Sequence, residues 1–144
     1  MRVVLDTNAL LVSISRKSRF HAIFEALEEK RYDLFVTTDI LNEYEEIIGE
    51  EMGEFAAQAV LNGFHLASNV HYIIKHYRWN LITADPDDDK FVDCAVAGNV
   101  DYLVTNDRHF RVLKGLTLPR VNVISIEAFH ALLTGQAIGI EQHE

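Results

Sequence analysis

The sequence has little of the residue types that most often break or cross-link a chain: one cysteine, two prolines and seven glycines among 144 residues. One cysteine excludes an internal disulfide and a zinc site built from cysteines alone. The shortage of proline and glycine argues against a long flexible linker and a repetitive all-β chain. The single cysteine, Cys94, lies in the apolar run of residues 91–97, so we expect it to be a small buried hydrophobic side chain.

Long hydrophobic runs are also missing. No segment approaches the roughly 18 consecutive apolar residues of a transmembrane helix, and the N-terminal residues, which include Arg2 and Asp6, lack the apolar stretch of a signal peptide. Hydrophobic residues make up 49% and charged residues 24% of the chain, which is a globular composition. We therefore expect one domain over residues 1–144, located in the cytoplasm and without a membrane partner.

Several familiar binding motifs are absent as well. The chain has no GxGxxG, GxxxxGK[ST] or GxSxG motif, which disfavours dinucleotide binding, P-loop nucleotide binding and an α/β serine hydrolase. Its seven histidines show no HExxH or comparable ligand spacing, so they predict no zinc site.

Acidic residues, by contrast, are plentiful. The chain has 22 Asp and Glu against 13 Lys and Arg, a formal net charge of −9. Such a charge counts against nucleic-acid binding, which usually needs a basic surface. If five of the acids surround a divalent metal, however, the rest of the chain carries only −4, and a bound cation attracts phosphate. A nucleic-acid substrate therefore stays compatible with the charge.

Short apolar runs alternate with amphipathic segments along the chain. We expect strands at residues 3–5, 33–36, 101–105 and 121–124, with 70–74 as an ambiguous further strand. We expect helices at residues 9–15, 20–30, 54–67, 89–98, 110–114 and 126–133, and one that starts after the possible N-cap at 37–39. Alternating strands and helices predict an α/β fold with a parallel sheet covered by helices on both faces.

Two aspartates stand at predicted strand ends. Asp6 directly follows the first predicted strand, and Asp107 comes just after the strand that ends near Thr105. Ligands of parallel sheets bind at the carboxyl ends of the strands. We therefore expect Asp6 and Asp107 to lie on the same edge of the sheet.

Three further acids could join this pair. Asp89 and Asp93 are four residues apart on one predicted helix, so they share one of its faces. Glu43 lies one turn into the helix that leaves the second strand. Carboxylates gathered in this way repel each other and need a cation, and their hard oxygen atoms suit Mg²⁺ or Mn²⁺. A metal so held can activate water and polarise a phosphoryl oxygen.

The competing interpretation of each acid is structural. An Asp after a strand often only caps a turn, and an acid on a helix is often only a solvated charge. Asp85, Asp87 and Asp88 fit this interpretation best, as residues of a turn and of a helix N-terminus. The joint occurrence of Asp6 and Asp107 at strand ends favours a site.

Three motifs resemble those of the PIN-domain family. Residues 3–8, VVLDTN, resemble the opening of PIN domains; residues 85–95, DPDDDKFVDCA, resemble the DPDDxxF motif of one bacterial subgroup; residues 101–107, DYLVTND, match the closing motif. The resemblance extends from Arg2 to about Leu133, and the order and spacing of the three motifs make it specific. The subgroup is described as the toxin component of toxin–antitoxin systems, similar to VapC-type toxins.

The resemblance implies a three-layer α/β/α sandwich around a mainly parallel sheet, and metal-dependent cleavage of RNA. It implies catalytic roles for Asp6, Glu43, Asp89 and Asp107, and Mg²⁺ or Mn²⁺ bound by Asp6, Asp89, Asp93 and Asp107. It also implies polar residues that support the acids: Thr7, Asn8, Thr105 and Asn106.

Basic residues near the predicted edge are candidates for contacts to the RNA backbone, with ordinary solvated surface as the competing interpretation. They are Arg16, Lys17 and Arg19 after the first helical stretch, and Arg108, Arg111 and Lys114 beside Asp107. For a toxin, the resemblance further implies a cognate antitoxin protein and a homodimer.

Other functions remain open at this point. An Asp-based phosphohydrolase would place its nucleophile at Asp6, but the haloacid-dehalogenase type expects a second Asp where this chain has Asn8. A receiver domain expects paired acids after its first strand and a later Lys at a strand end, and this chain has neither. A non-catalytic PIN-like interaction module is the third alternative, although all the expected acids are present.

Overall fold

A computed structural model describes residues 1–75 and 77–136 of the chain. Five strands form one parallel sheet: β1 (Arg2–Leu5), β2 (Asp33–Val36), β3 (Val70–Tyr72), β4 (Tyr102–Val104) and β5 (Val123–Ile124). The α-helices are α1 (Thr7–Ile14), α2 (His21–Glu28), α3 (Thr38–Met52), α4 (Glu54–Leu66), α5 (Asp89–Ala97) and α6 (Ile126–Thr134). Two 3₁₀ helices, η1 (Pro86–Asp88) and η2 (Arg108–Leu113), precede α5 and follow β4.

The strands lie in the order β3-β2-β1-β4-β5, so the first strand in the chain is central in the sheet. All four pairings are parallel, and Leu5 of β1 is level with Val104 of β4. Val3, Val4 and Leu5 are completely buried, as expected for a strand covered on both faces. Because β1 and β4 end level with each other, Asp6 and Thr105 emerge side by side.

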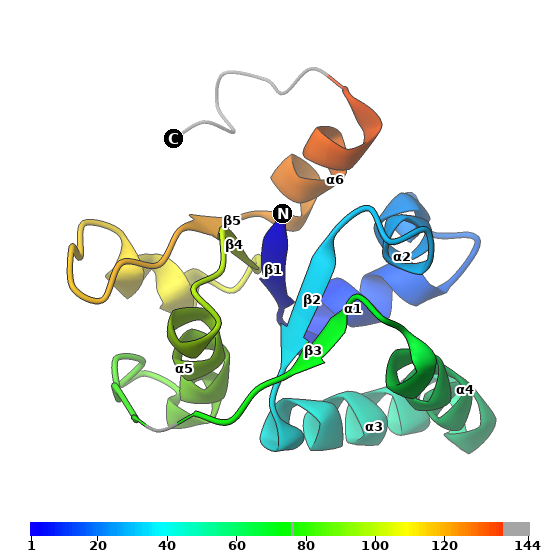
Figure 1. Ribbon diagram of the computed structural model, residues 1–144, viewed down its shortest axis with the longest axis horizontal. Helices are drawn as coiled ribbons and strands as arrows, with labels where there is room; N and C mark the ends of the chain where they lie inside the picture. Colours follow the sequence, from blue (N-terminus) through cyan, green and yellow to red (C-terminus); the bar gives the residue numbers. More distant parts are fainter. Residues whose placement is uncertain (76, 137–144) are drawn as a thin grey trace.

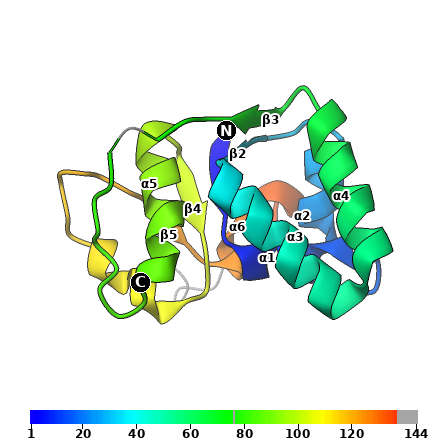
Figure 2. The ribbon, with the colours of Figure 1, turned by 90° about the horizontal axis from the view of Figure 1, so that it is seen from below.

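Helices cover both faces of this sheet. Figure 1 shows α5 on one side and α1, α2 and α6 on the other. α5 packs against β1, β2 and β4, while α2 packs against α1 and α6. α3 and α4 pack against each other as a pair, which Figure 2 shows from below. The predicted parallel sheet with helices on both faces is therefore confirmed.

The element bounds differ from the predicted ones where side chains cap a helix. α1 begins at Thr7 and not at residue 9, because the Asp6 carboxylate accepts a hydrogen bond from the Ala9 amide at 2.8 Å. The segment predicted as a helix at residues 110–114 is the 3₁₀ helix η2. It starts at Arg108, because Asp107 accepts from the His109 amide at 2.9 Å.

Other expectations are confirmed with small changes. The ambiguous segment 70–74 contains the edge strand β3, and the last strand is confined to Val123–Ile124. Cys94 is completely buried in the hydrophobic core, as expected. Within residues 1–75 and 77–136, no helix has the length and apolar composition that crossing a membrane requires.

Candidate functional site

The site begins where β1 and β4 end. The Asp6 amide donates to the Val104 carbonyl at 3.1 Å, which continues the ladder of the sheet past β1. The Thr105 hydroxyl donates to the other oxygen of the Asp6 carboxylate, opposite the one that caps α1 at Ala9. Asp6 is only 7% exposed. Strand pairing, helix capping and the threonine together fix one carboxylate at the carboxyl edge of the sheet.

The surroundings of Asp6 disfavour its charged form. The pKa of Asp6 is raised to about 6, chiefly by burial and in smaller part by the negative charges of Asp107 and Glu43. The hydrogen bonds from Thr105 and Ala9 lower the pKa and offset only part of this effect. A buried carboxylate with acidic neighbours is a site at which a cation would be stabilised.

Thr105 also connects Asp6 with the second acid. Its hydroxyl oxygen accepts a hydrogen bond from the Asp107 amide at 3.0 Å while it donates to Asp6. The Asp107 carboxylate caps η2 through the His109 amide. The acid after β4 is thus held in place by its own strand end and by the helix that it starts.

Glu43 reaches the site from α3. Its neighbour Tyr44 is completely buried and donates its hydroxyl to the Leu5 carbonyl at 2.5 Å, which anchors α3 beside the end of β1. The Thr7 hydroxyl donates to one Glu43 oxygen, and the Lys90 ammonium lies 2.8 Å from the other. Glu43 is therefore held from both sides next to Asp6.

Lys90 is an unexpected member of the site. Its ammonium contacts Glu43 at 2.8 Å, the Asp87 carboxylate at 2.9 Å and the Asp87 carbonyl at 2.7 Å, so its three protons have three acceptors. The side chain is 9% exposed, and contacts with Glu43 and Asp87 raise its pKa despite the burial. Lys90 balances one negative charge of the acid cluster. It also connects Asp87, in the turn before α5, with Glu43 of α3.

Asp88 completes the cluster from η1. The pKa of Asp88 is raised to about 7, chiefly by burial and in smaller part by Asp85, Asp107 and Asp6. Its Oδ2 atom is buried and has no hydrogen-bond partner among residues 1–75 and 77–136. Asp85, Asp88 and His109 each offer one possible ligand atom, and these atoms lie within 4.8 Å of one another.

Asp89 and Asp93, in contrast, face away from this cluster. The Asp89 carboxylate accepts from the Ile82 amide at 2.7 Å, and Asp93 accepts from the Trp79 amide at 3.0 Å. Both line a cleft of about 280 Å³ that also contains Lys75 and Arg78. Consecutive helical residues point in directions about 100° apart. The expected position of Asp89 beside Asp6 is therefore corrected: Asp88, one residue earlier, points toward Asp6 and Asp107.

The predicted supporting residues divide in the same way. Thr7 and Thr105 hydrogen-bond to acids of the cluster. Asn8 is exposed. The Asn106 side chain accepts from the Ile126 amide at 2.8 Å and donates to Glu127 at 3.0 Å, so it holds the start of α6 and not an acid of the cluster.

The basic candidates lie in two places. Arg16, Lys17 and Arg19 are exposed between α1 and α2, and Arg19 pairs with Glu127 at 3.3 Å. Arg108, Arg111 and Lys114 line a shallow cleft of about 380 Å³ that contains Asp107 and Thr105. This second group adjoins the acid cluster through a shared cleft.

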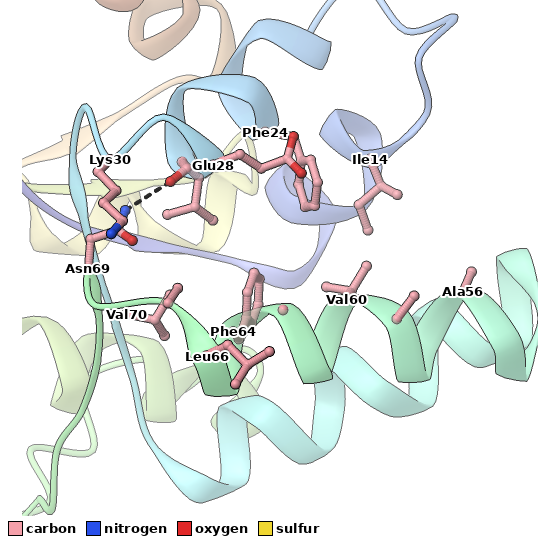
Figure 3. Close-up of a pocket in the computed structure, with 14 residues that line it drawn as sticks. Ile14, Phe24, Glu28, Lys30, Ala56, Val60, Phe64, Leu66, Asn69 and Val70 are labelled. Atoms are coloured by element: carbon pink, nitrogen blue, oxygen red, sulfur yellow. Dashed lines mark hydrogen bonds between the residues drawn. The ribbon is translucent and has the colours of Figure 1, made fainter.

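A larger groove, about 550 Å³, lies elsewhere and is apolar. Figure 3 shows Phe24 on one wall and Val60 and Phe64 on the other, from α2 and α4. None of the acids of the cluster lines this groove. The chemical groups, and not the size of the cavity, therefore identify the candidate site.

The sequence did not predict three residues at or beside the cluster: Asp88, Lys90 and His109. Asp88 was assigned to a turn, and Lys90 gave no signal because a lysine on a helix is usually solvated. His109 stands two residues after Asp107, and that short spacing was its only signal.

Comparison with known proteins identifies the family and the fold. The family described as "PIN domain" matches residues 2–109. Among solved structures, a similar one is the crystal structure of VapBC2 from Rickettsia felis bound to a DNA fragment from their promoter. The match has a TM-score of 0.58 and 19% identity, and covers 87% of this chain and 98% of that chain. At this identity the likeness concerns the fold alone. The comparison with curated proteins gives no match.

Proposed function

The chain belongs to the PIN-domain family, and from this premise we propose that it is a metal-dependent endoribonuclease. The proposed site consists of Asp6, Glu43, Asp88 and Asp107, within a single domain. One observation carries the proposal: carboxylates from separate segments converge, and the cluster holds more negative charge than Lys90 balances.

The residues of the cluster fit a divalent metal. The pKa of Asp6 is raised to about 6 and that of Asp88 to about 7, so in the absence of a cation the cluster resists full ionisation. Asp88 has a buried oxygen without a hydrogen-bond partner in the described part of the chain. Carboxylate oxygens are the ligands that Mg²⁺ and Mn²⁺ take. Asp6, Asp88 and Asp107 would hold the ion.

In the proposed reaction, a bound divalent ion supplies Lewis-acid activation of water and of the scissile phosphate. The residues of the chain position the groups around it. Thr105 orients Asp6 and Asp107 through two hydrogen bonds. Thr7 and Lys90 fix the Glu43 carboxylate at the edge of the cluster, where it would orient the attacking water.

The proposed substrate is RNA. Arg108, Arg111 and Lys114 line the cleft that contains Asp107, so phosphates that approach the cluster would meet positive charge first. This local charge offsets the net charge of −9, which otherwise repels nucleic acid. The choice of RNA over DNA follows from the family resemblance and is open to direct test.

A protein partner belongs to the same proposal. The similar Rickettsia felis structure is a VapBC2 assembly bound to promoter DNA. By analogy, we infer that this chain is the toxin of a toxin–antitoxin pair, that it acts in the cytoplasm as a homodimer, and that a cognate antitoxin binds it.

The test is cleavage of labelled RNA and single-stranded DNA by purified protein, with Mn²⁺, Mg²⁺ or EDTA, beside Asp6→Asn. We expect RNA cleavage that needs the metal and falls at least about 1,000-fold in Asp6→Asn, because the ion contributes several kcal/mol to the transition state. Asn keeps an oxygen to cap α1, so the variant should fold. Cleavage that persists in EDTA or in folded Asp6→Asn would contradict the proposal.

A further inference from the structure

We propose that His109 is a nitrogen ligand of the metal site and gives it a preference for Mn²⁺ over Mg²⁺. The proposal rests on the metal-dependent function inferred above. It concerns a residue type that the carboxylate cluster does not include, and it names the ion that the site selects.

The position of His109 follows from the start of η2. Asp107 caps this helix through the His109 amide, which brings the imidazole back toward the cluster. Its Nδ1 atom lies 3.4 Å from Asp107 Oδ1 and 3.7 Å from Asp88 Oδ2. The three side chains come from two segments about 20 residues apart in the sequence, so their convergence is a property of the fold.

The atoms that face each other lack partners. His109 Nδ1 and Asp88 Oδ2 are both buried, and neither makes a hydrogen bond to any residue that the structure describes. A buried polar atom without a partner costs about 1–3 kcal/mol, and here two such atoms lie opposite each other. Their 3.7 Å separation is longer than the 2.7–3.2 Å of a hydrogen bond.

The separation instead suits two ligands of one ion. Two atoms each about 2.1 Å from an ion, at about 90–120° from each other, are roughly 3.0–3.6 Å apart. The distances from His109 Nδ1 to Asp107 and Asp88, 3.4 and 3.7 Å, come within this range if the side chains move by only a few tenths of an ångström. A cation between His109, Asp88 and Asp107 would give both orphaned atoms a partner.

The nitrogen ligand decides which ion is favoured. Mg²⁺ is a hard cation that takes oxygen ligands and keeps its waters, whereas imidazole suits first-row transition metals. A site with only carboxylates would accept either ion. Replacing one oxygen ligand by His109 therefore shifts the preference toward Mn²⁺.

The experiment is pulsed electron paramagnetic resonance on the Mn²⁺-loaded protein, which detects ¹⁴N bound to manganese. We expect the ¹⁴N modulation in the wild type and its loss in His109→Gln, which keeps the backbone amide that Asp107 needs. Calorimetric titration should give about a 10-fold weaker Mn²⁺ affinity and a Mg²⁺ affinity changed by less than about 3-fold. His109→Asn is a second variant if His109→Gln misfolds.

His71→Gln is the matched control. The two imidazoles are similarly exposed, at 40% for His71 and 36% for His109, and each faces a carboxylate, but His71 pairs with Asp33 at the opposite part of the sheet. The control should keep both the ¹⁴N signal and the Mn²⁺ affinity. Bound Mn²⁺ without ¹⁴N modulation, absence of Mn²⁺ binding, or equal losses of Mn²⁺ and Mg²⁺ affinity in His109→Gln would overturn the proposal.

RNA cleavage, measured separately, distinguishes the two proposals. Metal-dependent cleavage without a nitrogen signal would leave the ribonuclease standing and remove His109 as a ligand. A nitrogen signal without cleavage of any RNA would keep the ligand and remove the ribonuclease.

Discussion

Two neighbouring aspartates, Asp88 and Asp89, belong to different acidic regions of the molecule. Asp88 joins Asp6 and Asp107 in the cluster at the strand ends, where its Oδ2 atom has no hydrogen-bond partner among the described residues. Asp89 joins Asp93 in a cleft with Lys75 and Arg78, and both of these aspartates accept backbone hydrogen bonds from the loop before η1. Two adjacent residues thus lie in two different environments, the cluster and the cleft.

The two regions differ in how their negative charge is compensated. In the cleft, Asp89 and Asp93 accept hydrogen bonds from the Ile82 and Trp79 amides, so these acids hold the loop in place. Burial still raises the pKa of Asp93, but the Trp79 amide, Lys75 and Arg78 oppose that effect. In the cluster, burial and mutual repulsion raise the pKa values of Asp6 and Asp88, and Lys90 balances only one charge. We therefore interpret Asp89 and Asp93 as structural, and the acids of the cluster as the groups that the proposed ion would compensate.

Removing the negative charge of Asp88 or of Asp89 is the strongest test of this difference between the cluster and the cleft. Asp88→Asn should lower kcat for RNA cleavage about 100-fold, because it removes a charge that would face the ion. Asp89→Asn should keep most of kcat and destabilise the protein by about 1–2 kcal/mol, since a charged acceptor of the Ile82 amide becomes neutral. Cleavage assays and urea unfolding measure the two effects. Loss of cleavage in Asp89→Asn with full activity in Asp88→Asn would reverse the assignment.

The sequence predicted the sheet and the two strand-end acids because both depend on local patterns. Apolar runs that alternate with helical segments specify a parallel sheet, and the carboxyl ends of such strands share one edge. Asp6 and Asp107 follow from that edge alone. Glu43 followed from its position one turn into a helix that leaves the neighbouring strand.

The choice between Asp88 and Asp89 could not be predicted in this way. Both stand at the junction of η1 and α5, where a 3₁₀ turn passes into an α-helix and shifts the direction of successive side chains. His109 could not be predicted either, since its contact with Asp88 joins η1 and η2, which only the folded sheet brings together. Lys90 has the spacing of an ordinary surface lysine, and its burial depends on α3.

The pH dependence of stability offers a second contrast between the regions. The pKa of Asp6 is raised to about 6, so in the metal-free protein Asp6 contributes stability that is present below about pH 4 and is lost as the pH rises through 6. Asp6→Asn should remove this contribution and stabilise the metal-free protein at pH 8 by on the order of 2–3 kcal/mol. The raised pKa of Asp88, about 7, leaves a second loss in the same direction. Chemical denaturation of the wild type and Asp6→Asn in EDTA between pH 4 and 8 measures this, and the same change of stability with pH in both proteins would contradict it.

Lys90 connects the two regions, because it lines the cleft and also contacts Glu43 of the cluster. Lys90→Met should release Glu43 and lower kcat about 10-fold with little change in KM, and Lys90→Arg should restore part of it. Lys75→Met is the control, since Lys75 pairs with Asp39 at 2.7 Å in the same cleft. It should affect stability only. Equal losses of kcat in Lys90→Met and Lys75→Met would mean that Lys90 has no specific positioning role.

The smallest effect is expected where the cluster meets the substrate. Arg111 lines the cleft beside Asp107, whereas Arg78 lines the cleft of Asp89 and Asp93. If RNA enters over Asp107, Arg111→Gln should raise KM about 3-fold at moderate salt and lower the slope of log KM against log salt by about 0.7, the contribution of one phosphate contact. Arg78→Gln should change neither value. A change in Arg78→Gln and none in Arg111→Gln would mean that the RNA backbone passes over the cleft of Asp89 and Asp93. The salt dependence of KM makes this distinction, because a contact to a phosphate changes the salt dependence and not kcat.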